Sequence, residues 1–275
     1  MKHAIHMLKS VTAGQMNSFL ITTESGKVIA IDGGRREDAD YFLRNLRELT
    51  GTQVPPVDAW FLTQPHCDHI DAFMEIMEKH EGELTVDRVY FNFPSAYFMT
   101  LEPDYSAADT IGEFYACLPH FADKVCFCFG YDRIDIGEAH FDVLYSPDFE
   151  ITENVCNNAS LVFRMSLGGK TAMFTGDCGV EAGQKILRLW KDTGILKSDI
   201  CQMAHHGQNG CDREFYEAVA PDVCLWCTPL WLWNNDIGQG YNTHIWKTVT
   251  VRGWMEEIGA TTHLVIKDGT QVYAW

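Results

Sequence analysis

The most informative stretch of the sequence reads Thr63-Gln64-Pro65-His66-Cys67-Asp68-His69 and follows the apolar segment Val57–Leu62. Two imidazoles and one carboxylate lie close together, at the point where a short strand is expected to end. Packing in a core does not require such a group, whereas metal ions are bound by imidazole nitrogens and carboxylate oxygens. The stretch therefore predicts part of a metal site, placed where a strand gives way to a helix.

Further polar clusters adjoin other predicted strands. They are Asn157-Asn158-Ala159-Ser160, Thr175-Gly176-Asp177, His205-His206-Gly207 and, more weakly, Tyr241-Asn242-Thr243-His244. Loops that follow neighbouring strands line one edge of a sheet, so these clusters are expected to converge with the first. Gly176 frees the backbone to bring the carboxylate of Asp177 close, and a carboxylate between two cations can bridge them.

The predicted elements alternate in both halves of the chain. Helices are expected over Glu37–Leu49, Asp71–Lys79, Tyr105–Phe121, Val180–Lys191, Asp212–Val219 and Ile245–Ile258. Strands are expected over Phe19–Thr22, Val28–Ile31, Val57–Leu62, Asp87–Phe93, Ala139–Tyr145, Ser160–Leu167, Thr171–Thr175, Asp199–Met203, Asp222–Cys227, Thr262–Ile266 and Gln271–Ala274. The last two strands are expected to form a closing hairpin around Asp268-Gly269.

This order predicts the α/β class. Each half opens with strand hairpins and then interleaves strands with helices, which suits two sheets packed face to face with helices outside. We therefore expect a four-layer αββα sandwich that forms one domain over residues 1–275. The segment at about 94–129 fits this pattern least and is expected to form a helical lid or insertion.

Composition limits the possible partners. The 38 acidic and 21 basic residues give a net charge of −17, which repels phosphate backbones and disfavours long nucleic acid as a partner. The ten cysteines form no compact framework and many lie in apolar runs, which is typical of a reducing compartment. Because neither a signal-peptide core nor a run of about 18 apolar residues is present, we expect a cytoplasmic protein without a membrane partner.

The order of the motifs resembles the metallo-β-lactamase superfamily. Within it, the sequence is most similar to the hydrolase domain of bacterial competence DNA-uptake proteins and to phosphorylcholine esterases. The family's H-x-H-x-D-H motif corresponds to residues 64–69, with Gln64 in the place of the first histidine. Its bridging aspartate corresponds to Asp177, its H-H-G motif to residues 205–207, its N-x-x-S segment to residues 157–160 and its late histidine to His244. The resemblance covers nearly the whole chain and implies the metallo-β-lactamase fold.

The resemblance also implies which of these residues would bind each metal ion and which would act in catalysis. One divalent metal would be held by Asp68, His69 and His206, with Asp177 as the bridge to a second. The second position would use His66, the amide oxygen of Gln64, and Asn157 or Asn158. Amide oxygens are weaker ligands than imidazole for zinc, so one or two ions per chain, zinc or manganese, are expected. The expected catalytic residues are Asp68, His205 and His244, with His205 facing the substrate.

The function implied is a metal-dependent hydrolase that cleaves phosphoester bonds in a small or short substrate by attack of a metal-bound hydroxide. Two alternatives remain open at this point. Gln64 is also compatible with a degenerate fold retained as a binding or scaffold protein, and the same fold hosts acyl hydrolases of the lactonase or thioesterase type. The aromatic stretch at 228–235 is either core, a contact in a homo-oligomer, or a wall of the substrate site.

Overall fold

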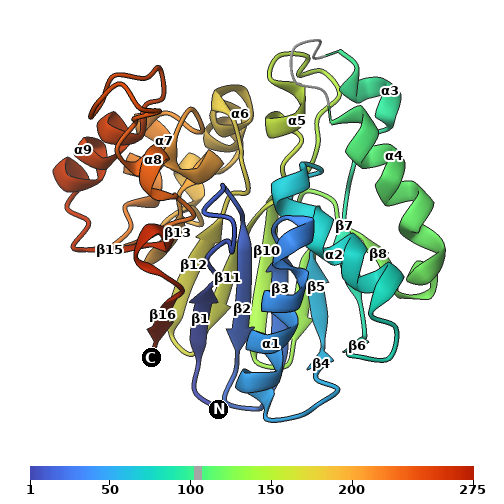
Figure 1. Ribbon diagram of the computed structural model, residues 1–275. Helices are drawn as coiled ribbons and strands as arrows, with labels where there is room; N and C mark the ends of the chain where they lie inside the picture. Colours follow the sequence, from blue (N-terminus) through green and yellow to red (C-terminus); the bar gives the residue numbers. More distant parts are fainter. Residues whose placement is uncertain (102–106) are drawn as a thin grey trace.

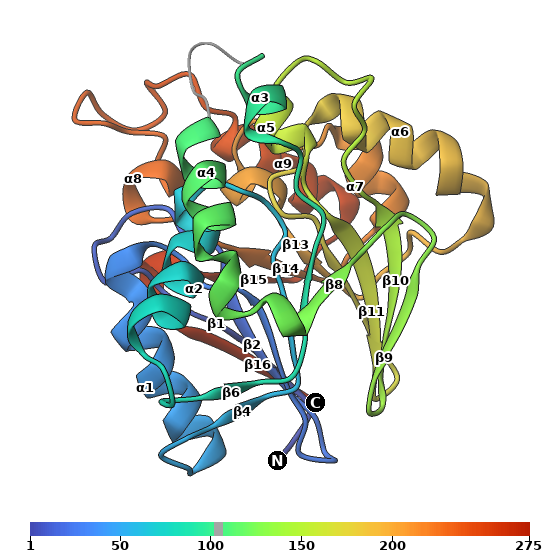
Figure 2. The same cartoon turned by 90° about the vertical axis from the view of Figure 1, so that its right-hand side faces the viewer.

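The computed structural model describes residues 1–101 and 107–275, and it contains two large sheets packed face to face between outer helices (Figures 1 and 2). The predicted α/β class and the four-layer αββα arrangement are confirmed. Tyr105, where one helix is expected to begin, lies outside the described residues. That helix, α4, spans Ala108–Cys117 within them.

Among residues 1–101 and 107–275, the first sheet has seven strands. In spatial order they are β16 (Gln271–Ala274), β1 (Ala4–Met7), β2 (Ser18–Thr22), β3 (Val28–Asp32), β5 (Ala59–Phe61), β7 (Val89–Phe91) and β8 (Val125–Phe127). The pairs from β16 to β3 are antiparallel, and those from β3 to β8 are parallel. The short strands β4 (Pro56–Val57) and β6 (Thr85–Val86) pair separately.

The second sheet repeats this plan. Its order is β15 (Thr262–Val265), β14 (Val223–Trp226), β13 (Ile200–Gln202), β12 (Lys170–Phe174), β11 (Val162–Leu167), β10 (Ala139–Tyr145) and β9 (Arg133–Ile136). The pairs from β9 to β12 are antiparallel, and those from β12 to β15 are parallel. Parallel pairing needs crossover connections, which is why helices enter each half only after its hairpins.

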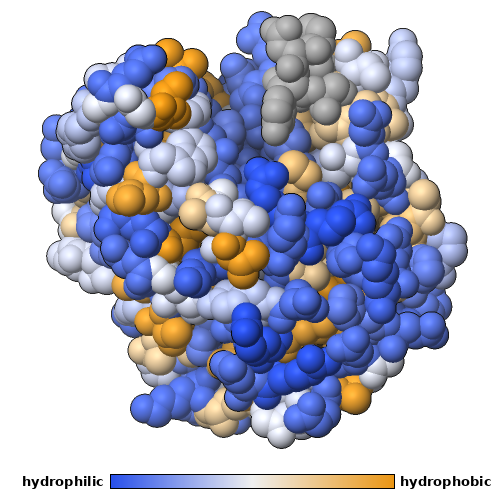
Figure 3. All heavy atoms as spheres, in the orientation of Figure 1, coloured by the Kyte–Doolittle hydropathy of each residue, from blue (hydrophilic) through white to orange (hydrophobic). Residues whose placement is uncertain are grey.

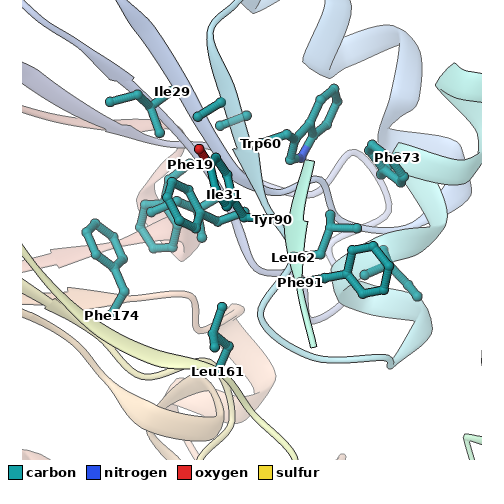
Figure 4. Close-up of a cluster of buried hydrophobic side chains, with 14 of the residues drawn as sticks. Phe19, Ile29, Ile31, Trp60, Leu62, Phe73, Tyr90, Phe91, Leu161 and Phe174 are labelled. Carbon is teal, nitrogen blue, oxygen red and sulfur yellow. The ribbon is translucent and has the colours of Figure 1, made fainter. Parts of the chain in front are cut away.

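Strand β5 shows how the layers are joined. Successive side chains of a strand point to opposite faces. Trp60 therefore faces the helices, where it stacks on Phe42 at 4.8 Å between ring centroids, while Phe61 faces the second sheet and meets Phe141 at 4.7 Å. Figure 4 shows Trp60 on the helix side of this core and Phe174 on the side of the second sheet.

The helices cover the two outer faces. The first sheet is covered by α1 (Ala39–Thr50), α2 (Cys67–Lys79) and α4, and the second by α6 (Val180–Trp190), α7 (Arg213–Val219) and α9 (Thr248–Ile258) (Figure 2). Shorter helices are α3 (Ala96–Met99), α5 (Val155–Asn158) and α8 (Leu230–Trp233).

The described residues of the segment at 94–129 contribute to the core. The buried ring of Phe114, on α4, meets Phe73 and Phe91 at centroid distances of 6.5 and 4.9 Å, and β8 extends the first sheet. The role of this segment as a lid stays a prediction.

The expected closing hairpin is wrong. β15 pairs in parallel with β14 in the second sheet, whereas β16 pairs antiparallel with β1 in the first. The chain does turn at Asp268-Gly269, where Gly269 has φ +107°, but the turn carries it from one sheet to the other. Each sheet has an open edge where the strand finds a partner along its whole length, β14 for β15 and β1 for β16. Strand β1, which supplies one of these edges, is not predicted from the sequence.

Within the described residues no helix has the length and apolar character needed to cross a membrane. All ten cysteines are free thiols. The face in Figure 3 is mostly hydrophilic, with apolar side chains in small scattered groups, in keeping with the acidic composition.

Candidate metal centre

The predicted polar clusters meet where strands of both sheets end. β5 leads through Thr63 into α2, whose first turn carries Asp68 and His69. In the second sheet, Asp177 follows β12, and His206 follows β13 in the short turn η5 (Ala204–Gly207). The site therefore requires both halves of the chain.

Four buried side chains converge there. The potential ligand atoms of Asp68, His69 and His206 all lie within 4.8 Å of one another. His206 Nε2 is 3.2 Å from Asp68 Oδ2 and 3.5 Å from Asp177 Oδ2, and His69 Nε2 is 3.2 Å from Asp177 Oδ1. Two imidazoles and two carboxylates at such distances form a donor set typical of zinc and related divalent ions.

The tautomers of both histidines suit metal binding. His69 Nδ1 lies 2.7 Å from Asp32 Oδ2, and His206 Nδ1 lies 3.0 Å from the carbonyl oxygen of Cys227. Each acceptor takes the Nδ1 proton and leaves the Nε2 lone pair for a cation. Both Nε2 atoms and Asp177 Oδ1 are buried and make no well-directed hydrogen bond to any described residue. The residues present therefore fit a metal ion.

Asp32 supports the centre from behind His69, and no motif of the sequence predicts this position. Its carboxylate accepts hydrogen bonds from the Thr63 N–H at 2.7 Å, the Thr63 hydroxyl at 2.5 Å and the Asn17 amide at 2.7 Å, in addition to His69. Asp32 thus fixes both the ring of His69 and the loop that leads to it. The sequence feature that could have indicated Asp32 is an acidic residue at the end of a strand, followed by Gly33-Gly34.

Backbone geometry at the centre depends on residues with positive φ. Gly176 has φ +52°, and a Cβ there would lie 3.0 Å from both Ser160 Oγ and Thr63 Oγ1, so glycine lets Asp177 approach. His205 and His206 also have positive φ, +51° and +53°, which costs about 1–2 kcal/mol for each residue with a side chain. Such strain is tolerated where a side chain must be aimed at a site.

The other predicted residues lie as follows. His205 Nε2 is 3.9 Å from Asp177 Oδ2, at the edge of the cluster. The side chain of Asn158 turns away toward α6, where its Oδ1 accepts from the N–H of Ala182. His244 contacts Trp246 at 3.9 Å between ring centroids, and of these two residues Trp246 lines the cavity beside the centre.

This cavity has a volume of about 320 Å³. Polar side chains line most of it, with one aromatic wall. They include Arg35, His66, Asp68, Asn157, His205 and Trp246. The cavity therefore offers a small ligand access to the carboxylates and imidazoles of the centre.

Burial and charge act together on these groups. Burial opposes protonation of His206, but the carboxylates of Asp177 and Asp68 outweigh it and raise the pKa of His206 to about 9. Burial also opposes protonation of His69, but the carboxylates of Asp177 and Asp32 outweigh it and raise the pKa of His69 well above its ordinary value. Burial opposes ionisation of Asp177, yet the charges of His206 and His69 outweigh it and hold its pKa low. The centre therefore stays ionised without a metal, with protons in the place of the cation.

The metal-free protein is expected to become less stable as pH rises from about 6.5 to about 9. Folded His206 keeps its proton up to about pH 9, whereas an unfolded histidine loses it near 6.5, so this stabilisation is complete below 6.5 and is lost through 9. Metal affinity should rise over the same range because the proton competes with the cation. Urea unfolding in the presence of a chelator at several pH values measures the stability of the metal-free protein. Metal titration over the same pH range measures the affinity. A flat stability profile for the metal-free protein would contradict this reading.

Comparisons of the sequence with known proteins also indicate a metal-binding family. Residues 11–136 match the family model of the metallo-beta-lactamase superfamily. ComE operon protein 3 of Bacillus subtilis (strain 168) is 30% identical over 95 residues, and this match covers 34% of the chain and 12% of that protein. The chain therefore matches only a small part of that relative's length.

Two solved structures share the fold. The metallo-beta-lactamase fold protein YhfI from Bacillus subtilis is 13% identical with a TM-score of 0.57, over 99% of this chain and 100% of that one. CmlA, a diiron beta-hydroxylase from Streptomyces venezuelae, is 12% identical with a TM-score of 0.58, over 100% of this chain and 54% of that one. The resemblance inferred from the motifs is confirmed.

Proposed function

We propose that this chain, which has the metallo-β-lactamase fold, is a metal-dependent hydrolase of phosphoester bonds in a small or short substrate. The observation that supports this most is the convergence of Asp68, His69, Asp177 and His206 beside a polar cavity, where the Nε2 atoms of both histidines lie within 3.5 Å of oxygens of Asp177. Bound there, a divalent cation, zinc or manganese, would polarise the phosphoryl oxygen and make water more acidic.

The surrounding residues of the chain suit an anionic substrate. The guanidinium of Arg35 lines the cavity and is half-buried, with Nε 3.1 Å from the carbonyl oxygen of Gln15. It is thereby positioned to attract a phosphoryl group into a centre that is otherwise acidic. His205, which also lines the cavity, would donate a hydrogen bond to a phosphoryl oxygen or to the leaving group. Trp246 would pack on an apolar or planar part of the substrate.

The size and charge of the molecule favour a short substrate. A cavity of about 320 Å³ suits a small molecule or a chain end, and the net charge of −17 repels long nucleic acid. Ten free thiols support a reducing compartment such as the cytoplasm. A role for His244 would be indirect, through its contact with Trp246.

Hydrolysis of a bis-aryl phosphodiester tests the proposal. Protein loaded with Zn²⁺ or Mn²⁺ should release the aryl alcohol, and protein treated with chelator should not, because the Lewis acid is removed. His205→Ala should lower turnover by about 100-fold, the usual effect of removing one donor to a developing charge. No turnover of phosphodiesters or phosphomonoesters with either metal would contradict the proposal.

An acyl hydrolase is the principal alternative within the same centre, because a metal polarises a carbonyl oxygen as well as a phosphoryl oxygen. A lactone and a thioester assayed in parallel decide between them. A binding or scaffold role is supported by Gln64, and it predicts no turnover of any of these substrates at full metal loading.

A further inference from the structure

The side chain of Gln64 stands in the sequence place of a metal-ligating histidine, and it is fully buried and hydrogen-bonded on three sides. Its amide Nε2 lies 2.9 Å from Asn157 Oδ1 and also hydrogen-bonds with His66 Nδ1. Its Oε1 accepts from the hydroxyl of Ser160 at 3.2 Å. Both N–H groups and the oxygen of the amide are therefore engaged.

The surrounding donors fix the direction of this amide. The N–H of Asp177 donates to Ser160 Oγ at 3.0 Å, so the hydroxyl hydrogen of Ser160 is directed to Gln64 Oε1. The Nδ2 of Asn157 donates to Asn154 Oδ1 at 2.7 Å, so the oxygen of Asn157 faces Gln64. Reversing either amide would set donor against donor.

This arrangement does not fit a second metal ion. A cation needs lone pairs that point to it, but the single lone pair of His66 Nδ1 accepts from one N–H group of Gln64, and Asn157 Oδ1 accepts from the other. The amide oxygen of Gln64, a metal ligand by its place in the motif, accepts a hydrogen bond from Ser160 instead.

The same hydrogen bond sets the tautomer of His66. The amide nitrogen of Gln64 can only donate, so His66 Nδ1 must accept and cannot carry a proton. A neutral imidazole that accepts at Nδ1 carries its proton on Nε2. His66 lines the cavity and therefore brings an uncharged N–H donor to the side where a second cation would otherwise act.

We propose that the hydrogen-bonded cluster Gln64–Asn157–Ser160 replaces one metal of a paired-metal site. The chain then binds a single ion through Asp68, His69, His206 and Asp177, and His66 donates a hydrogen bond to an anionic oxygen of the substrate. The role of His66 toward substrate rests on the proposed hydrolase function. The count of metal ions and the tautomer of His66 do not depend on any substrate.

Metal analysis tests the count. Wild-type protein saturated with Zn²⁺ or Mn²⁺ and then desalted should contain one ion per chain by mass spectrometry. Gln64→Glu keeps the shape of the side chain but exchanges the N–H donors for a carboxylate, so it should raise the content toward two ions. Gln64→Met, which removes the donors without adding a ligand, is the matched control and should stay at one. Two ions per chain in the wild type would overturn this inference but leave the proposed function standing. A wild type that binds no ion would overturn both.

Nitrogen NMR of histidine-labelled protein tests the tautomer directly. The signals assigned to His66 by comparison with His66→Gln should show an unprotonated Nδ1 and a protonated Nε2, with or without the metal. A proton on Nδ1, or a shift of the His66 nitrogens typical of metal coordination, would overturn the inference. In turnover assays His66→Leu should lose about 100-fold in kcat, and His66→Gln, which keeps an N–H donor, should recover part of it. Equal loss in both variants would overturn the donor role.

Discussion

Asp177→Ala is expected to abolish metal-dependent hydrolysis, with a loss of turnover of about 1,000-fold or more. Asp177 is buried, and its two oxygens lie 3.2 Å from His69 Nε2 and 3.5 Å from His206 Nε2. Removal of this carboxylate takes one ligand and one negative charge from the centre. If the Lewis acid supplies about 4 kcal/mol of transition-state stabilisation, its loss corresponds to about 1,000-fold in rate.

The same variant should lose its metal, which separates this effect from a general loss of folding. Metal content by mass spectrometry should fall below one ion per chain, while circular dichroism should show that the sheets are retained. Asp177→Asn, which keeps the shape but not the charge, should behave like Asp177→Ala.

Asp135→Asn is the matched control. Asp135 also lies beside an imidazole, at 2.6 Å from His140 Nδ1, but both side chains are exposed, so metal content and turnover should be unchanged. Normal turnover in Asp177→Ala would contradict the proposed centre.

Asp32→Asn is expected to weaken both the fold and the metal site. Asp32 accepts hydrogen bonds from four donors on Thr63, Asn17 and His69, all of them buried. An asparagine would turn an N–H group toward at least one of these donors and would remove the negative charge beside His69. Breaking a buried charged pair in this way costs about 3 kcal/mol, which lowers the melting temperature by roughly 8 °C in a chain of this size.

The effect on the metal follows from the ring of His69. Without the acceptor at Nδ1, its tautomer and orientation are no longer fixed, and metal affinity should fall by about 10–100-fold. Calorimetric titration with Zn²⁺ measures the loss of metal affinity, and thermal unfolding measures the loss of stability.

Asp58→Asn is the matched control for Asp32→Asn. Asp58 accepts from the Val28 N–H at 2.8 Å and from Lys27 Nζ at 2.7 Å, at the opposite end of β3 from Asp32. This variant should lose some stability and keep its metal affinity. Equal metal affinity in Asp32→Asn and the wild type would show that Asp32 supports the fold alone.

The tertiary structure also changes how Gln64 is understood. From the sequence, Gln64 resembles a ligand weakened from imidazole to amide. Its buried contacts with Asn157, Ser160 and His66 instead give it the role of a hydrogen-bond donor and acceptor. The pattern of residue types shows that an amide is present, but only the positions of its neighbours fix which end of the amide faces which atom.

The sequence by itself determined the fold class, the alternation of strands and helices, and the polar stretches that meet at the centre. These depend on local periodicity and on short spacings, which the chain order preserves. The tertiary structure alone decided the separation of β15 and β16 into different sheets, the support of His69 by Asp32, and the position of His206 among Asp68, His69 and Asp177. Each of these joins residues far apart in the chain, and such pairing is set by which edges and cavities the packed sheets leave, not by any local pattern.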